Sequence, residues 1–274
     1  MISDRERLQG YVDSWRGAAD GVVALLRGLD DADWARPTDL EGWDVKAVAS
    51  HLAHLESELC GHPQEHVEVA EAPHLKSMMS YYTEAGVLAR APRDPAAIVD
   101  ELAEAVATRA QTLAAEPPTD ASVVPERTPG GIAWTWETLL SNRVVDMWMH
   151  EQDIRRAVGR PGGMSTPAAT HTVGVFTQGF GYVVGKRVAP PAGTTVVLDV
   201  TGVGPVHLAV QVEESGRAVP VVERVDEPTV TLRMDLETFV VLAGGRRPPH
   251  DVSVEVTGDQ DLGRSVLAAM AVTP

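Results

Sequence analysis

The chain has 274 residues, more than the roughly 100–200 of a typical single domain, so we expect two domains. Its 23 Lys and Arg residues against 39 Asp and Glu residues give a formal net charge of −16, which excludes nucleic acid and anionic membrane surfaces as partners. The charged N-terminus, the lack of a long apolar run and the single cysteine, Cys60, indicate a cytoplasmic protein without a leader, a membrane span or an internal disulfide.

Helical periodicity runs through the first 160 residues. Four long stretches carry apolar residues at three- and four-residue intervals, and they cover residues 3–29, 45–59, 94–113 and 135–158. Asp44 is the expected N-cap of the second stretch, Pro95 lies in the first turn of the third, and Gly159 closes the fourth. A loop rich in Pro and His and a short segment over 75–90 separate the second stretch from the third. This pattern predicts an antiparallel four-helix bundle over residues 1–160.

The pattern changes after the linker at residues 161–163. A helix-like stretch over 167–188 precedes strands in which apolar and polar residues alternate, at 206–213, 230–234 and 252–256. Helical spacing returns over 235–242 and 259–270. We therefore predict an α+β domain with a mostly antiparallel sheet over residues 164–274.

Two histidines lie on the apolar sides of predicted bundle helices. His51 falls on the inward face of the stretch over 45–59. His150 follows Asp146 by one turn, and such a pair projects from one helix face to within reach of a single ion. Two imidazoles and one carboxylate leave positions open on a metal, which a catalytic site needs for water or substrate. These three residues are therefore candidate ligands of a divalent metal.

Simpler roles are open for the same residues. A single histidine on an apolar helix face is usually a hydrogen-bonded core residue, and Asp146 could pair with Arg143 or Arg155 instead of a metal. His54 is predicted to lie at the edge of the bundle, and Cys60 to be a small packed residue rather than a nucleophile. No metalloprotease helix, G-x-S-x-G, P-loop or G-x-G-x-x-G motif stands in the context that its chemistry requires.

Two segments of the chain resemble a known family. DWARPTDLEGWDVKAVASHL at residues 33–52 and VDMWMHEQDIRRAVGRP at residues 145–161 are similar to the mycothiol-dependent maleylpyruvate isomerase family. Residues 236–246 and 252–270 are similar to the ending of that family's second domain. The resemblance implies an α plus α/β two-domain chain, with a DinB-like metal-binding four-helix bundle followed by a sterol-carrier-like α+β domain.

The resemblance also implies site residues. By position, the family's metal ligands fall on His51, Asp146 and His150, the same residues that helix facing selects. The carboxylate in this family is more often Glu, so Asp146 shortens one ligand arm by a methylene. Asp153 matches an acidic residue of the family and would hydrogen-bond a ligand imidazole, whereas a helix-surface acid paired with Arg156 or Arg160 is the alternative.

The chemistry follows from the same resemblance. A divalent metal, zinc by the family link, would lower the pKa of mycothiol or a related low-molecular-weight thiol and present thiolate at neutral pH. Addition of thiolate to an activated cis alkene such as maleylpyruvate, followed by elimination, gives the trans isomer. The same site could instead leave the thiol on a small electrophile, as an S-transferase does in detoxification or natural-product biosynthesis. A non-catalytic protein that binds a small ligand is the third hypothesis.

Substrates of this family carry carboxylates, and the predicted bundle site has few cations of its own. The turn over 243–249 presents Arg246 and Arg247, and the resemblance places Arg246 in a recurrent Gly-Arg position of the second domain. A planar guanidinium there could hold a carboxylate by two hydrogen bonds. We therefore predict that Arg246 completes the catalytic site for an anionic electrophile, with a solvated loop charge as the alternative.

Overall fold

The computed structural model describes residues 2–273, and its contacts divide the chain into two units. One unit ends at His171 and the next begins at Thr172, inside α6 (Pro167–Tyr182), which lies after the boundary expected at 160–164. Gly159 does end a helix, with left-handed backbone at φ 67°. However, His171 hydrogen-bonds Ser141 at 2.9 Å and packs against the Tyr11 ring. The first turn of α6 therefore packs with the helices that precede it.

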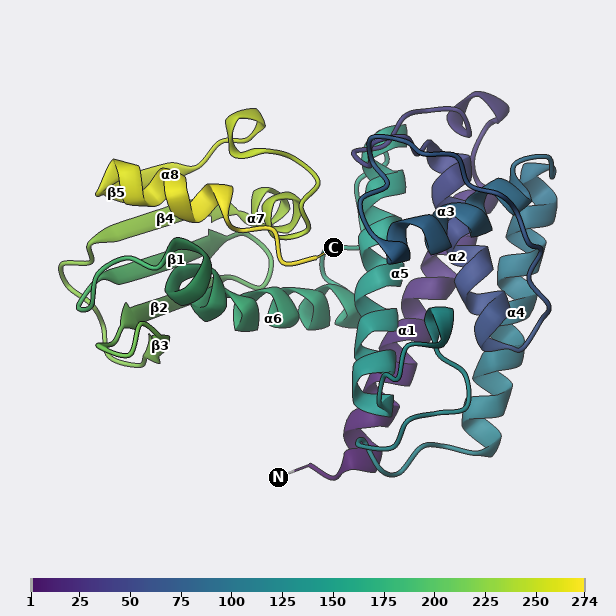
Figure 1. Cartoon of the computed structure of the whole chain (residues 1–274), viewed down its shortest axis with the longest axis horizontal. Coiled ribbons are helices and arrows are strands. Elements are labelled where there is room, and N and C mark those ends of the chain that lie inside the picture. The colour runs from purple at the N-terminus through teal and green to yellow at the C-terminus, as the bar shows by residue number, and fades with distance from the viewer. Residues whose placement is uncertain (1, 274) are drawn as a thin grey trace. The chain divides into compact units, whose positions relative to one another are not determined.

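The first unit is a helical bundle (Figure 1). Its long helices match the predicted stretches and are α1 (Asp4–Arg27), α2 (Val45–Leu59), α4 (Pro95–Ala115) and α5 (Trp136–Val158). Helices α1 and α2 each pack against α4 and α5, and the shorter α3 (Met78–Arg90) packs against α2. The Asp44 side chain caps α2 by accepting a hydrogen bond from the Ala47 amide at 2.8 Å. Among residues 2–273, no helix combines the length and apolarity that crossing a bilayer requires.

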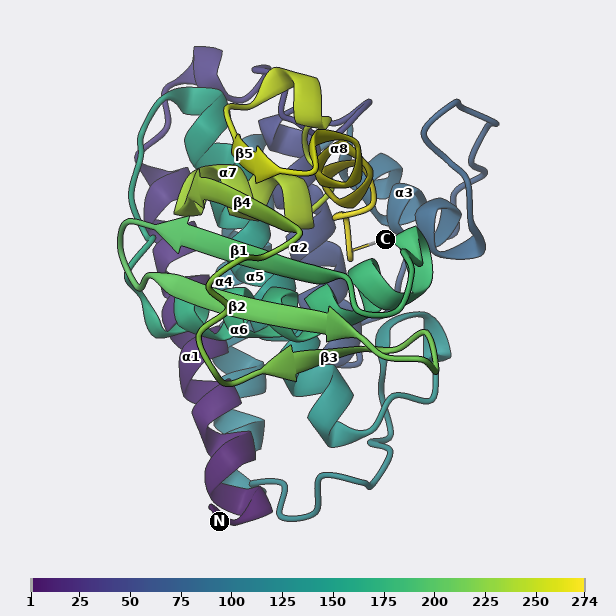
Figure 2. The same cartoon turned by 90° about the vertical axis from the view of Figure 1, so that its left-hand side faces the viewer.

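The second unit holds a sheet with helices packed against it (Figure 2). Within the described residues the strand order is β3-β2-β1-β4-β5, formed by β1 (Thr195–Thr201), β2 (Val206–Val212), β3 (Ala218–Val221), β4 (Val230–Asp235) and β5 (Glu255–Gly258). Strands β1 and β4 run parallel, and the other neighbouring pairs are antiparallel, which confirms a mostly antiparallel sheet. The packed elements are the π-helical turn η3 (Val183–Val188), α7 (Leu236–Ala243) and α8 (Gln260–Ala268).

Alternation of apolar and polar residues found only part of this sheet. It missed β1, because buried Val197 stands between Val196 and Leu198 and makes residues 196–198 a continuous apolar run that interrupts the alternation. It also missed β3, a short strand that contains Pro220 at the edge of the sheet. The last strand was predicted from Val252, but it begins at Glu255, because residues 252–254 leave the 3-10 turn at Pro249–Asp251 as irregular backbone.

A buried ion network joins the bundle helices. Glu56 on α2 is 0% exposed and accepts hydrogen bonds from Arg143 on α5 at 2.9 Å and from Arg109 on α4 at 2.8 Å. Trp15 of α1 donates to the same carboxylate at 3.0 Å. Burial by itself would raise the pKa of Glu56, but the charges of the two arginines outweigh it and lower that pKa, so the carboxylate is ionised. Because charge burial is costly, the network stabilises only when all of its members are present.

We expect Glu56→Gln to reduce the free energy of unfolding by about 3–5 kcal/mol, since the substitution leaves Arg109 buried without a counter-charge and leaves Arg143 with Asp146 alone. Urea unfolding with a chelator present measures this effect without any contribution from bound metal. Glu126→Gln is the matched control, because that carboxylate is 82% exposed and its ion pair with Arg127 should contribute less than about 1 kcal/mol. Equal effects of the two substitutions would contradict a structural role for the buried charge.

Candidate metal centre

Helices α2 and α5 bring the candidate ligands together. His51 projects from the middle of α2, while Asp146 and His150 lie one turn apart on α5. The two helices are in contact, and both histidines are buried, with 4% and 6% of their surface exposed. The three side chains that the sequence selected from separate segments therefore meet inside the first unit.

Their donor atoms form a compact triangle. Nε2 of His51 and Nε2 of His150 each lie 3.5 Å from Oδ1 of Asp146, and one ligand atom from each residue lies within 4.8 Å of the others. Two ligands bound to one tetrahedral zinc ion at about 2.1 Å are separated by about 3.4 Å. The spacing and the donor types therefore fit a single divalent ion with positions left open.

A hydrogen bond on the side of the ring away from Asp146 fixes the orientation of His150. Its Nδ1 lies 3.0 Å from Oδ2 of Asp153, which is fully buried, and the other oxygen of Asp153 accepts a hydrogen bond from Arg156. Nδ1 thus donates to Asp153, which leaves Nε2 as the ring nitrogen that faces Asp146 and is available to a metal. Arg156 in turn binds Asp39 at 3.0 Å. Asp153 therefore contacts both His150 and Arg156, but it is buried rather than on the helix surface.

Asp146 pairs with Arg143 and also faces the two histidines. Its Oδ1 faces the two histidines, while its Oδ2 accepts a hydrogen bond from Arg143 Nη1 at 2.9 Å. Burial alone would raise the pKa of Asp146, but the charges of Arg143, His150 and His51 outweigh it and hold the pKa well below its usual range. The residue is therefore an anion with one oxygen directed at the imidazoles.

The two imidazoles differ in their surroundings. Burial lowers the pKa of His51, which favours the neutral ring that a metal ligand requires. For His150, burial acts in the same direction, but the charge of Asp146 and hydrogen bonds to Asp146 and Asp153 outweigh it and raise the pKa. His51 Nδ1 is buried and has no hydrogen-bond partner among the described residues. Trp43 covers both rings, with centroid distances of 5.1 Å to His51 and 6.3 Å to His150.

Other residues singled out from the sequence lie outside the triangle. His54 was predicted at the bundle edge, but it is only 4% exposed, because it packs against α3 and hydrogen-bonds Gln64 at 2.8 Å. Cys60 is half-buried, with its Sγ 3.1 Å from the Ala105 carbonyl, and burial raises the pKa of its thiol. Arg246 belongs to the second unit, where its Nη1 donates to the Gly244 carbonyl at 2.7 Å. Its catalytic role stays a prediction.

Several residues that support the site were not predicted from the sequence. Glu56, Arg109 and Trp43 had no predicted role, and Arg143 was considered only as a competitor for Asp146. A charged residue at an inward-facing helical position would have indicated a buried ion pair, and Glu56 on α2 and Arg109 on α4 both occupy such positions. Such residues must be paired, but helical periodicity does not say with what.

Comparisons with known proteins identify the family. The sequence model described as the mycothiol maleylpyruvate isomerase N-terminal domain matches residues 15–155, and the one described as the MDMPI C-terminal domain matches residues 170–264. A search of curated proteins finds no match.

Solved structures of the mycothiol-dependent maleylpyruvate isomerase and of a histidine-to-alanine variant of it share this fold. Their TM-scores are 0.53 and 0.54, their sequence identities are 19% and 18%, and each comparison covers 94% of this chain and 96% of the other. This similarity confirms the fold class, and the N-terminal family match spans more than half of the sequence. The chain therefore belongs to the mycothiol maleylpyruvate isomerase family.

Proposed function

We propose that the protein is a divalent-metal enzyme that uses mycothiol or a related low-molecular-weight thiol to isomerise a small activated alkene such as maleylpyruvate. The observation that carries the proposal is the buried triangle of His51, Asp146 and His150, whose ligand atoms lie within 4.8 Å of one another. Membership of the family supports the thiol and the isomerisation. Zinc is the proposed metal, because two imidazoles and a carboxylate with open positions suit it.

In this proposal each residue of the triangle holds the ion by one atom. His51 and His150 offer Nε2, and Asp146 offers Oδ1 while Arg143 holds its other oxygen. Asp153 keeps the hydrogen on Nδ1 of His150. A divalent ion bound there lowers the pKa of a neighbouring thiol and so makes thiolate available at neutral pH.

The proposed reaction leaves the thiol unchanged. Thiolate forms a C–S bond to one alkene carbon, and the electron pair of the double bond moves to the activating carbonyl group. The remaining C–C single bond rotates, the electron pair returns, and the C–S bond breaks to release thiolate and the trans alkene. Trp43 would exclude water from one side of the triangle, because its ring lies over both histidines.

We propose a small, anionic electrophile as the substrate and the cytoplasm as the place of action. The charge of −16 disfavours nucleic acid and anionic membranes as partners. If the thiol instead stays on the electrophile, the protein is an S-transferase. If the triangle binds no metal, the hypothesis of a non-catalytic protein that binds a small ligand is favoured.

The purified protein is expected to contain about one divalent ion per chain, and His51→Ala and His150→Ala are expected to lose it, because two remaining ligands hold zinc poorly. Elemental analysis measures the occupancy. His66→Ala is the matched control, since this exposed loop histidine lies outside the triangle. Full occupancy in both triangle variants would contradict the metal centre.

A graded variant tests the support of His150 in the same experiment. Asp153→Asn should keep the ligands but weaken metal affinity by about 10–100-fold, because the ring loses its charged partner. Competition with a chromophoric chelator measures this. Glu151→Gln is the control, since Glu151 is a buried carboxylate on the same helix that pairs with Arg155 instead.

The fate of the thiol separates isomerase from S-transferase. With maleylpyruvate in excess over mycothiol, we expect many product molecules per thiol and a constant free-thiol concentration. Proton NMR follows the alkene, and a thiol-reactive dye follows the thiol. Loss of one thiol per molecule of product would instead identify an S-transferase, and zinc-loaded protein that converts no alkene and consumes no thiol would contradict both activities.

Arg246→Ala is expected to raise KM for an anionic substrate by about fivefold or more, since a carboxylate loses a bidentate partner. Metal content should stay unchanged, because none of the triangle residues lies in the second unit. Arg247→Ala on the same turn is the control. Steady-state kinetics that do not change in the Arg246 variant would remove this residue from the site and leave substrate recognition to the bundle.

A further inference from the structure

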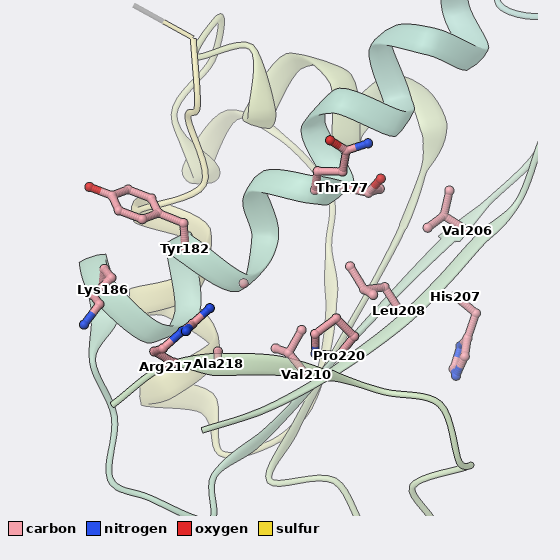
Figure 3. Close-up of a pocket in the computed structure, with 12 residues that line it drawn as sticks. Thr177, Tyr182, Lys186, Val206, His207, Leu208, Val210, Arg217, Ala218 and Pro220 are labelled. Atoms are coloured by element: carbon pink, nitrogen blue, oxygen red, sulfur yellow. The ribbon is translucent and has the colours of Figure 1, made fainter. Parts of the chain in front are cut away.

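The second unit contains a groove that the proposed thiol chemistry does not use. It lies between α6 with η3 on one side and strands β2 and β3 on the other (Figure 3), and its volume is about 590 Å³. Small-molecule sites in proteins typically measure about 300–1,000 Å³. All of its lining residues belong to the second unit, so the groove is complete within that unit.

Glycines explain why one end of the groove is closed. A Cβ at Gly181 would lie 2.9 Å from the Ala218 carbonyl oxygen, and one at Gly185 would lie 2.5 Å from the Ala218 nitrogen. Only glycine therefore lets α6 and η3 come this close to β3. One turn before Gly181 on α6, Thr177 lines the groove.

The floor of the groove is an uncovered part of the sheet's core face. Val206 and Leu208 of β2 pair with Val200 and Leu198 of β1, which are 1% and 0% exposed. Val206 and Leu208 are themselves only half-buried, and both line the groove. Two side chains whose neighbours form the core thus face the hollow, which gives it a binding surface for an apolar group.

Two cations lie at the end of the groove where the helix meets the sheet. Lys186 comes from η3 and Arg217 from the residue before β3, and Figure 3 shows both at this end, with Val206 and Leu208 toward the other. Both side chains are exposed, and within residues 2–273 neither forms an ion pair. In a chain of charge −16, two unpaired cations beside an apolar floor favour an anionic head group on an apolar body.

We propose that this groove binds an amphipathic carboxylate, with the carboxylate between Lys186 and Arg217 and the apolar chain on Val206 and Leu208. From Thr177 to Lys186 the helical wall is about 14 Å long, the scale of an extended medium-chain acid. A compact inorganic anion would not cover the apolar side chains of the floor, and a neutral chain would not pair with the two cations. This site is independent of the metal centre and of the reaction proposed for it.

Isothermal titration of the full-length, zinc-loaded protein with decanoate tests the proposal. We expect about one decanoate per chain. Decanol keeps the tail without the charge, butyrate keeps the charge with a short tail, and decyltrimethylammonium reverses the charge, so each should bind at least about tenfold more weakly. The absence of decanoate binding up to about 1 mM, or equal binding of decanol, would overturn the site.

Charge-reversed variants locate the binding. Lys186→Glu combined with Arg217→Glu should weaken decanoate binding by at least about tenfold, because two attractions become repulsions. Arg5→Glu combined with Arg264→Glu is the matched control, since these two exposed residues make the same change in net charge outside the groove. Both changed cations are exposed, so the fold should be retained, which thermal unfolding checks. Equal affinities for the double variant and the control would place decanoate elsewhere and overturn the proposal.

Discussion

The guanidinium of Arg143 is the constraint on which the candidate site depends. It is 0% exposed, and it binds Glu56 through Nε at 3.1 Å and Nη2 at 2.9 Å while its Nη1 binds Asp146 at 2.9 Å. Because the guanidinium is planar and its donors are fixed, the position of Glu56 in the core determines where Oδ2 of Asp146 lies. Oδ1 is then left toward the two imidazoles. The packing of α2 against α5 and the geometry of the donor triangle are therefore one arrangement.

A second chain of contacts ties the site to the segment before α2. Asp153 contacts both His150 and Arg156, and Arg156 binds Asp39. The same segment supplies Trp43, which packs against the rings of His51 and His150. Residues 33–52 and 145–161, the two segments that carry the family resemblance, thus meet around one centre. Their distinctive residues occur together because each segment orients groups of the other.

Site residues could be predicted from the sequence where the spacing within one helix determines which side chains share a face. The interval between Asp146 and His150 and the facing of His51 were read from spacing alone, and the structure brings these three together. Ion pairs between residues on different helices could not be predicted in this way. Nothing in the spacing of α2 says that Glu56 meets Arg143 from a helix about ninety residues later, because ion pairing depends on how the helices pack.

In the second unit, too, the sequence pattern predicted only part of the structure. Strands with regular alternation of apolar and polar residues were found, while the buried Val197 interrupts this alternation in β1. Its parallel pairing with β4 places it at the centre of the sheet, between β2 and β4. The groove was also invisible, since Val206 and Leu208 have the pattern of core residues and only the path of α6 leaves them uncovered.

The aspartate at position 146 can be understood from its two partners. One oxygen is 2.9 Å from Arg143, and the other is 3.5 Å from Nε2 of His51 and from Nε2 of His150. A glutamate on the same backbone would carry its carboxylate about 1.5 Å farther from α5, so it would press on the imidazole rings or lose the arginine. The shorter arm is therefore matched to Arg143 and to the spacing of α2 and α5. Since separations of 3.5 Å already suit two ligands of one tetrahedral ion, shortening the arm does not open the donor triangle.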